Sequence, residues 1–87
     1  AIHGSHWKCK MSKEHIQDVI LQSLQEYFDD LDGQKPTDVY NMIMRTVEKP
    51  VLMAVMVHAK NNQSHAAEML GINRNTLRKK LLEHGLL

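Results

Sequence analysis

Hydrophobic residues recur at helical spacing along most of the chain, and they predict a succession of four helices. The first extends from Ser12, whose hydroxyl can cap the first turn, to the Asp32-Gly33 pair, which favours a left-handed helix end. A single apolar stripe lies along this helix, with spacings of three and four residues. Its members are Ile16, Ile20, Leu24, Tyr27, Phe28 and Leu31.

The second predicted helix covers residues 39–59, with Thr37 as its N-terminal cap and Asn61-Asn62 as its end. Its apolar residues cover most of the circumference: Tyr40, Met42, Ile43, Met44, Val47, Val51, Leu52, Met53, Val55, Met56 and Val57. Such a helix must be buried on nearly all sides, and self-association is the simplest way for a short chain to achieve this. Because the pattern continues in phase after Pro50, we expect a kink there and not a break.

Two short helices joined by a tight turn follow. Asn62 is expected to cap a helix over residues 63–70, and Asn73 to cap one over residues 74–84, with the turn Gly-Ile-Asn at 71–73 between them. The residues expected to face inward are Ala66, Ala67, Leu70, Leu77 and Leu81. This arrangement predicts a helix-turn-helix.

The polar face of the last helix carries residues suited to double-stranded DNA. Four cations lie between positions 74 and 80, interleaved with amides and a hydroxyl. A helix in the major groove places its first residues at base edges, where Arg74 can present a bidentate fork to guanine. The other candidates suit phosphates, which position a protein without specifying sequence. The full candidate set is Asn62, Ser64, Asn73, Arg74, Thr76, Arg78, Lys79 and Lys80.

Composition and charge narrow the class of protein. Hydrophobic residues make up 43% and charged residues 24% of the 87, which is typical of a globular chain. Residues 11–50 carry four basic and eight acidic side chains, whereas residues 51–87 carry five basic and two acidic, so the second half suits a polyanion. No apolar run is long enough to span a membrane. A single cysteine, Cys9, fits a reducing cytoplasm.

No motif of an enzyme stands in the chain: it lacks a glycine-rich phosphate loop, a serine nucleophile elbow and the H-E-x-x-H zinc motif. We therefore expect no enzymatic activity, no cofactor, no metal and no small-molecule substrate. We expect residues 1–11 to be a disordered tail or an expression scar, with Met11 as a natural start. Residues 12–60 are then a dimerisation region, and residues 61–87 the DNA-binding region.

The segment GINRNTLRKKL at 71–81 resembles the helix-turn-helix of the Fis (factor for inversion stimulation) family, an element that the ends of NtrC-type activators share. The segments LDGQ at 31–34, DVY at 38–40 and VEKP at 47–50 are similar to the Fis dimerisation core. The resemblance covers about residues 15–87. It implies an all-helical homodimer with an intertwined four-helix core and two recognition helices set closer than one DNA turn, so that bound DNA bends.

The resemblance also implies roles for single residues. Asn73 and Arg74 would contact base edges, Arg78 and Lys60 would lie near the flanking backbone, and specificity would come mostly from DNA shape. The residues implied at phosphates are Asn62, Ser64, Thr76, Lys79 and Lys80. We therefore expect a nucleoid-associated transcriptional regulator that bends DNA. Two alternatives stay open: the DNA-binding end of an NtrC-type activator, and a dimeric helical adaptor that binds proteins through its basic helix.

Overall fold

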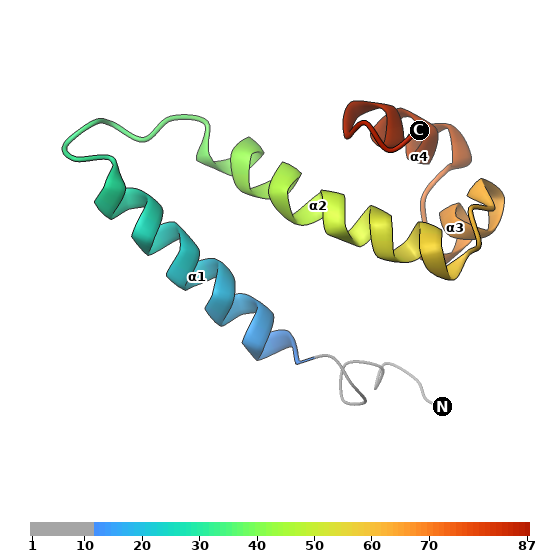
Figure 1. The fold of residues 1–87 in the computed structure, drawn as a ribbon, viewed down its shortest axis with the longest axis horizontal. Coiled ribbons are helices and arrows are strands. Elements are labelled where there is room, and N and C mark those ends of the chain that lie inside the picture. The colour runs from blue at the N-terminus through green and yellow to red at the C-terminus, as the bar shows by residue number, and fades with distance from the viewer. Residues whose placement is uncertain (1–11) are drawn as a thin grey trace. The chain divides into compact units, whose positions relative to one another are not determined.

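The computed structural model describes residues 12–87, and within that range the chain forms four α-helices and no strand. These are α1 (Lys13–Asp30), α2 (Val39–His58), α3 (Gln63–Leu70) and α4 (Arg74–Glu83), as Figure 1 shows. The predicted all-α class is confirmed. The expectations for the tail at 1–11 lie outside the described residues. The chain divides between Thr37 and Asp38 into two compact units.

The first unit contains α1, whose two ends follow the sequence prediction. The Ser12 hydroxyl oxygen accepts a hydrogen bond from the backbone N–H of His15 at 3.1 Å. After the last turn, Asp32 and Gly33 adopt positive φ values of 52° and 87°, the left-handed region that ends helices. The helix contains no buried residue, although it carries the predicted apolar stripe. Nothing in the described chain therefore covers that stripe fully.

The second unit begins at α2, and the prediction for its cap is wrong. Asp38, not Thr37, is the N-cap, and it adopts the left-handed conformation (φ 56°, ψ 31°). Aspartate tolerates this conformation better than most residues, so the chain turns sharply at the position directly before the helix. The Asp38 carboxylate accepts a hydrogen bond from the Asn41 side-chain amide at 2.9 Å and caps no backbone N–H.

The helix α2 continues through Pro50 without a break, as predicted. Its C-terminal end comes one residue earlier than the predicted asparagine pair. Lys60 and Asn61 take the left-handed positions, with φ values of 55° and 63°. The Lys60 N–H donates to Val57 at 3.1 Å and the Asn61 N–H to Met56 at 2.9 Å, which closes the helix end. Asn62 is thereby left in an extended conformation that allows it to cap α3.

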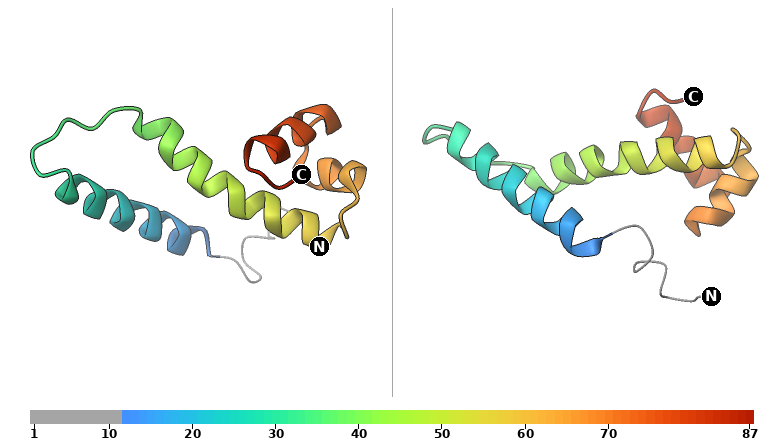
Figure 2. Two further views of the ribbon diagram at one scale, coloured as in Figure 1. Left: turned by 45° about the horizontal axis from the view of Figure 1, so that its top comes forward. Right: turned by 60° about the horizontal axis from the view of Figure 1, so that its bottom comes forward.

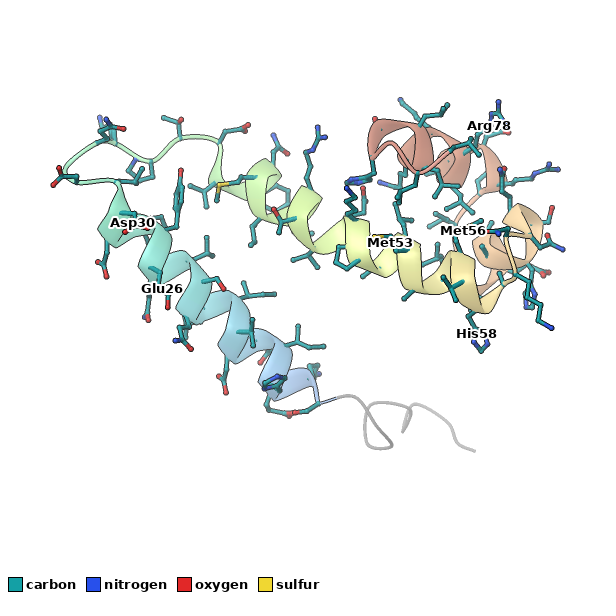
Figure 3. All side chains as sticks on the ribbon, viewed as in Figure 1. Glu26, Asp30, Met53, Met56, His58 and Arg78 are labelled. Carbon is teal, nitrogen blue, oxygen red and sulfur yellow. The ribbon has the colours of Figure 1, made fainter. Side chains whose placement is uncertain are left out.

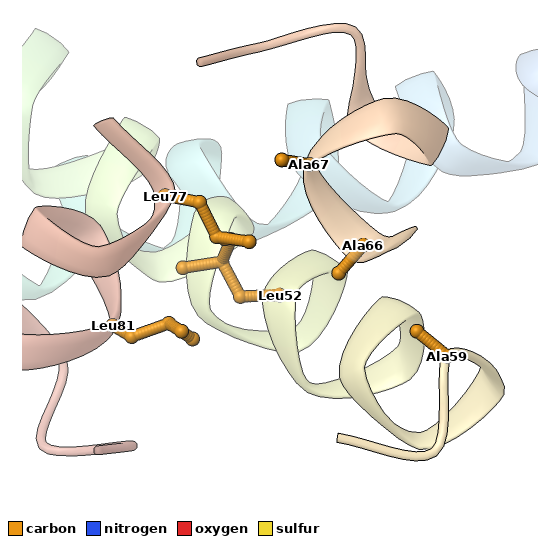
Figure 4. Close-up of a cluster of buried hydrophobic side chains, with 6 residues drawn as sticks. All are labelled: Leu52, Ala59, Ala66, Ala67, Leu77 and Leu81. Atoms are coloured by element: carbon orange, nitrogen blue, oxygen red, sulfur yellow. The ribbon is translucent and has the colours of Figure 1, made fainter. Parts of the chain in front are cut away.

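The core of this unit lies where α3 and α4 pack against the C-terminal half of α2 (Figures 1 and 2). Its buried members are Leu52, Ala59, Ala66, Ala67, Leu77 and Leu81, drawn in Figure 4. The four residues predicted to be buried in α3 and α4 are confirmed, and the fifth, Leu70, is half-buried. Burying one leucine contributes about 1.5–3 kcal/mol, so three fully buried leucines dominate the stability of the unit.

Candidate DNA-binding surface

The turn between α3 and α4 sets the direction of the second helix. Gly71 has a φ of 73°, its N–H donates to Glu68 at 3.1 Å, and the Ile72 N–H donates to Ala67 at 3.0 Å. This pair of bonds is a Schellman motif, in which the residue after the left-handed position packs back on the helix. No atom lies within 4 Å of a Cβ added to Gly71, so backbone conformation and not space favours glycine here.

Two asparagines cap the helices of this motif, as predicted. The Asn62 side-chain oxygen accepts the backbone N–H of His65 at 3.1 Å, and that of Asn73 accepts the backbone N–H of Asn75 at 2.7 Å. Each capping bond uses the amide oxygen. The NH2 group of the same side chain is a donor of the kind that phosphates and base acceptors require.

Seven of the eight candidate residues are exposed, on the outside of the helix-turn-helix. They are Asn62, Ser64, Asn73, Arg74, Thr76, Arg78 and Lys79. The α4 members share that helix with Leu77 and Leu81, which are buried against α2, so the two kinds of residue occupy different faces. Figure 3 shows Arg78 projecting outward from α4. A duplex approaching this face would meet arginine, lysine, amide and hydroxyl groups.

The eighth candidate, Lys80, lies on a different side of α4 and faces α2. Its ammonium nitrogen is 2.8 Å from one carboxylate oxygen of Glu48, and the other oxygen is 2.8 Å from Nε2 of His84. The Glu48 and Lys80 side chains are about one-third exposed, whereas that of His84 is 5% exposed. Because a carboxylate only accepts hydrogen bonds, Nε2 of His84 carries the proton. We call these three residues the Glu48 junction.

Charge and hydrogen bonding in this junction stabilise the ionised forms of Glu48 and Lys80. The hydrogen bonds from Lys80 and His84 hold the pKa of the Glu48 carboxyl below its ordinary range. The hydrogen bond to Glu48 raises the pKa of the Lys80 ammonium. Neither Glu48 nor His84 is among the candidate residues predicted from the sequence. Helical spacing places Lys80 and His84 one turn apart at the end of α4, but it does not show that both meet Glu48 on α2.

Other kinds of site receive no support from the described part of the chain. Between residues 12 and 87, no group of three or more His, Cys, Asp or Glu side chains is arranged to hold a metal ion. No helix in the same range combines the length and the hydropathy that crossing a bilayer would require.

These features define the class of protein: an all-α chain with a C-terminal helix-turn-helix whose last helix presents cations and amides to solvent. Residues 43–84 match the model of a family described as bacterial regulatory protein, Fis family.

Related proteins are similar to this chain over most of its length. A protein of Ralstonia nicotianae designated Fis-like is 56% identical over 77 residues, which are 88% of this chain and 100% of that protein. A Fis-like protein of Neisseria meningitidis serogroup A is 56% identical over 72 residues, or 83% of this chain and 91% of its own length. The DNA-binding protein Fis of Proteus mirabilis is 42% identical over 77 residues, covering 88% and 79%. The chain belongs to the Fis family.

Proposed function

We propose that the chain is a homodimeric DNA-binding protein that bends duplex DNA and regulates transcription, acting in the nucleoid of the bacterial cytoplasm without enzymatic activity. The observation that carries this proposal is the exposed face of α4, set by the Gly71 turn in a chain of the Fis family. Relatives designated DNA-binding protein Fis share 42–45% of the aligned residues.

The contacts follow from the position of each exposed candidate on the motif. Asn73 and Arg74 stand at the N-terminal end of α4, the end that enters the major groove in helix-turn-helix proteins, and we assign them to base edges. Arg78 lies one turn further along and is assigned to the flanking backbone. The remaining exposed candidates are assigned to phosphates: Asn62, Ser64, Thr76 and Lys79. Lys80 differs from these residues, because its ammonium is already paired with the Glu48 carboxylate.

Homodimerisation is supported by the apolar residues that α2 leaves exposed. Val51 is 45%, Met53 49% and Val57 78% exposed, although they lie on the same helix as the fully buried Leu52. Apolar side chains on several sides of one helix need more cover than two short helices supply. A second copy of the chain would bury them. Two recognition helices held closer than one turn of DNA would then require the duplex to bend, which makes DNA deformability part of specificity.

The match to relatives favours this proposal over the end of an NtrC-type activator. The similarity includes residues before the helix-turn-helix and extends over the whole of the Ralstonia protein, whereas the element common to activator ends is the helix-turn-helix alone. An adaptor that binds proteins through α4 is the second candidate, because a basic helix also suits an acidic protein surface.

Titration of a random-sequence duplex at several salt concentrations tests the proposal. We expect two chains per bound duplex and an affinity that falls steeply with salt, with a slope of about −0.9 per phosphate contact. Lys79→Met should reduce the slope by about 0.9 for each copy of the chain, whereas the matched change Lys35→Met, at an exposed lysine outside the motif, should leave it unchanged. An adaptor would bind the duplex weakly at all salt concentrations.

A further inference from the structure

The Glu48 junction connects α2, which carries the proposed dimerisation surface, to α4, which carries the proposed DNA-binding face. Glu48 lies on α2, the helix with the exposed apolar surface, and Lys80 and His84 lie at the C-terminal end of α4. Both hydrogen bonds are 2.8 Å long and bridge more than 30 residues of sequence. The capping bonds of Asn62 and Asn73, by comparison, span three residues or fewer.

Geometry makes this junction suited to fixing the angle of α4. The leucine contacts of α4 with α2 are non-directional, and by themselves they restrain the rotation of one helix on another only through packing. A carboxylate that accepts one hydrogen bond at each oxygen adds directional, charge-assisted restraints at the edge of this contact. Because Arg74 is ten residues from His84, about 15 Å along the helix, a small rotation at the junction displaces the base-contacting end of α4.

The same contacts argue against a phosphate role for Lys80. Its positive charge is compensated by a carboxylate at 2.8 Å, so moving it to a phosphate exchanges one anionic partner for another. Moving the Lys80 ammonium to a phosphate would also leave His84 as the one remaining partner of the Glu48 carboxylate. The hydrogen bond from Lys80 is the main cause of the lowered pKa of that carboxyl group. Lys79, the adjacent lysine, is exposed and forms no ion pair with an acidic side chain of residues 12–87.

We propose that Glu48 is a positioning residue for DNA recognition, which holds α4 at a fixed angle on α2 through Lys80 and His84, and that Lys80 serves this junction and not a DNA phosphate. This inference rests on the proposed function in one respect: it assumes that DNA is the ligand of α4. It predicts that the junction governs how well the protein distinguishes a preferred duplex from a random one.

Three variants and one matched control test this inference. The variants are Glu48→Gln, Lys80→Met and their combination, and the control is Lys79→Met. Affinity is measured as a function of salt on a random duplex and on a duplex that the wild-type protein selects from a random-sequence pool. Each junction variant should reduce the ratio of the two affinities about two- to fivefold, as a partly exposed ion pair allows. The double variant should lose no more than either single one.

The salt dependence separates the junction from the DNA contacts. Lys80→Met should retain the wild-type salt slope, whereas Lys79→Met should lose about 0.9 per copy and weaken both duplexes about equally. A purely structural role would reduce the folded fraction, and hence both affinities, by the same factor. Circular dichroism gives the folded fraction of every variant, and if Glu48→Gln does not fold, Lys80→Met alone decides the outcome.

Two results would overturn the inference: a loss of salt slope in Lys80→Met as large as in Lys79→Met, or an unchanged affinity ratio in the folded junction variants. The proposed function is judged separately, from the stoichiometry and DNA bend of the wild-type protein. A monomeric or non-bending wild type would contradict the proposed function, while the affinity ratio would still test the role of Glu48.

Discussion

The first helix and the C-terminal unit both carry apolar residues at helical spacing, but only the C-terminal unit has buried residues. The helix α1 carries a regular apolar stripe and has no buried residue, whereas residues 38–87 bury six. In the C-terminal unit, α3 and α4 supply alanines and leucines that cover one face of α2. One chain therefore completes the core of its own helix-turn-helix. The apolar stripe of α1 and the exposed apolar residues of α2 are left uncovered, and we propose that a second copy of the chain covers them.

The largest expected effect comes from a charge on the uncovered part of α2. Val51 is 45% exposed in the single chain, so an aspartate there would be tolerated by a monomer. In a dimer that buries it, Val51→Asp places an unpaired charge in an apolar interface, at a cost of about 3–5 kcal/mol per copy. Sedimentation equilibrium should show dissociation. Lys49→Asp, at an exposed position on the same helix, serves as the control. A fully dimeric Val51→Asp protein would contradict the proposal that a second copy of the chain buries Val51.

Truncation in the core of the C-terminal unit should come next. Leu77 is fully buried, and Leu77→Ala removes its packing against α2 and α3, which should lower the free energy of unfolding by about 2–4 kcal/mol. Leu82, on the same helix but 55% exposed, provides the matched change Leu82→Ala, with an expected loss below about 0.5 kcal/mol. Urea unfolding followed by circular dichroism measures both. Similar losses at the two positions would mean that α4 is not packed as described.

The exposed face of α4 should affect DNA binding and not stability. Arg74→Ala should cost about 1–3 kcal/mol of binding free energy on a selected duplex and less on a random one, because a bidentate contact to guanine depends on sequence. Its thermal midpoint should stay that of the wild type, since Arg74 is exposed. Equal losses on the two duplexes would identify Arg74 as a phosphate contact.

The smallest expected effect is the loss of the stability contributed by the Glu48 junction when the pH is lowered. Because the pKa of Glu48 is lowered in the folded chain, its contribution to stability is present at neutral pH and is lost as the pH falls below about 4, toward the lowered pKa. Wild type should therefore exceed Glu48→Gln in stability by about 0.5–1 kcal/mol at pH 7, and by less at pH 3. Thermal unfolding at the two pH values checks this; a difference independent of pH would show that the charge of Glu48 does not stabilise the fold.

Local sequence patterns were sufficient to predict the four helices and the helix-turn-helix. Capping by Ser12, Asn62 and Asn73 depends on residues within one turn, so the sequence specifies it directly. The cap of α2 differs from the prediction because the chain enters this helix through Asp38 in the left-handed conformation, and the local sequence pattern does not show that path. Likewise, a left-handed lysine at position 60 is imposed by closure of the helix end and not by residue preference.

The candidate surface was predictable as a class but not residue by residue. Arg78, Lys79 and Lys80 are equivalent in a sequence, since each is a cation in one basic run. The fold distinguishes them, because Lys80 is on the side of α4 that meets Glu48, 32 residues earlier in the chain. Helical periodicity describes one helix at a time, and it carries no information about which side chains of two helices meet. Long-range polar pairs of this kind therefore need a structure.

Bending of a bound duplex is the decisive property to measure, because in the proposed dimer it depends on two copies of the chain and on the close spacing of their two recognition helices. A circular-permutation gel-shift experiment places one selected site at successive positions along duplexes of equal length. We expect complexes of two chains per duplex, whose mobility is lowest when the site is central. Mobility that is independent of site position, or a complex containing a single chain, would contradict it.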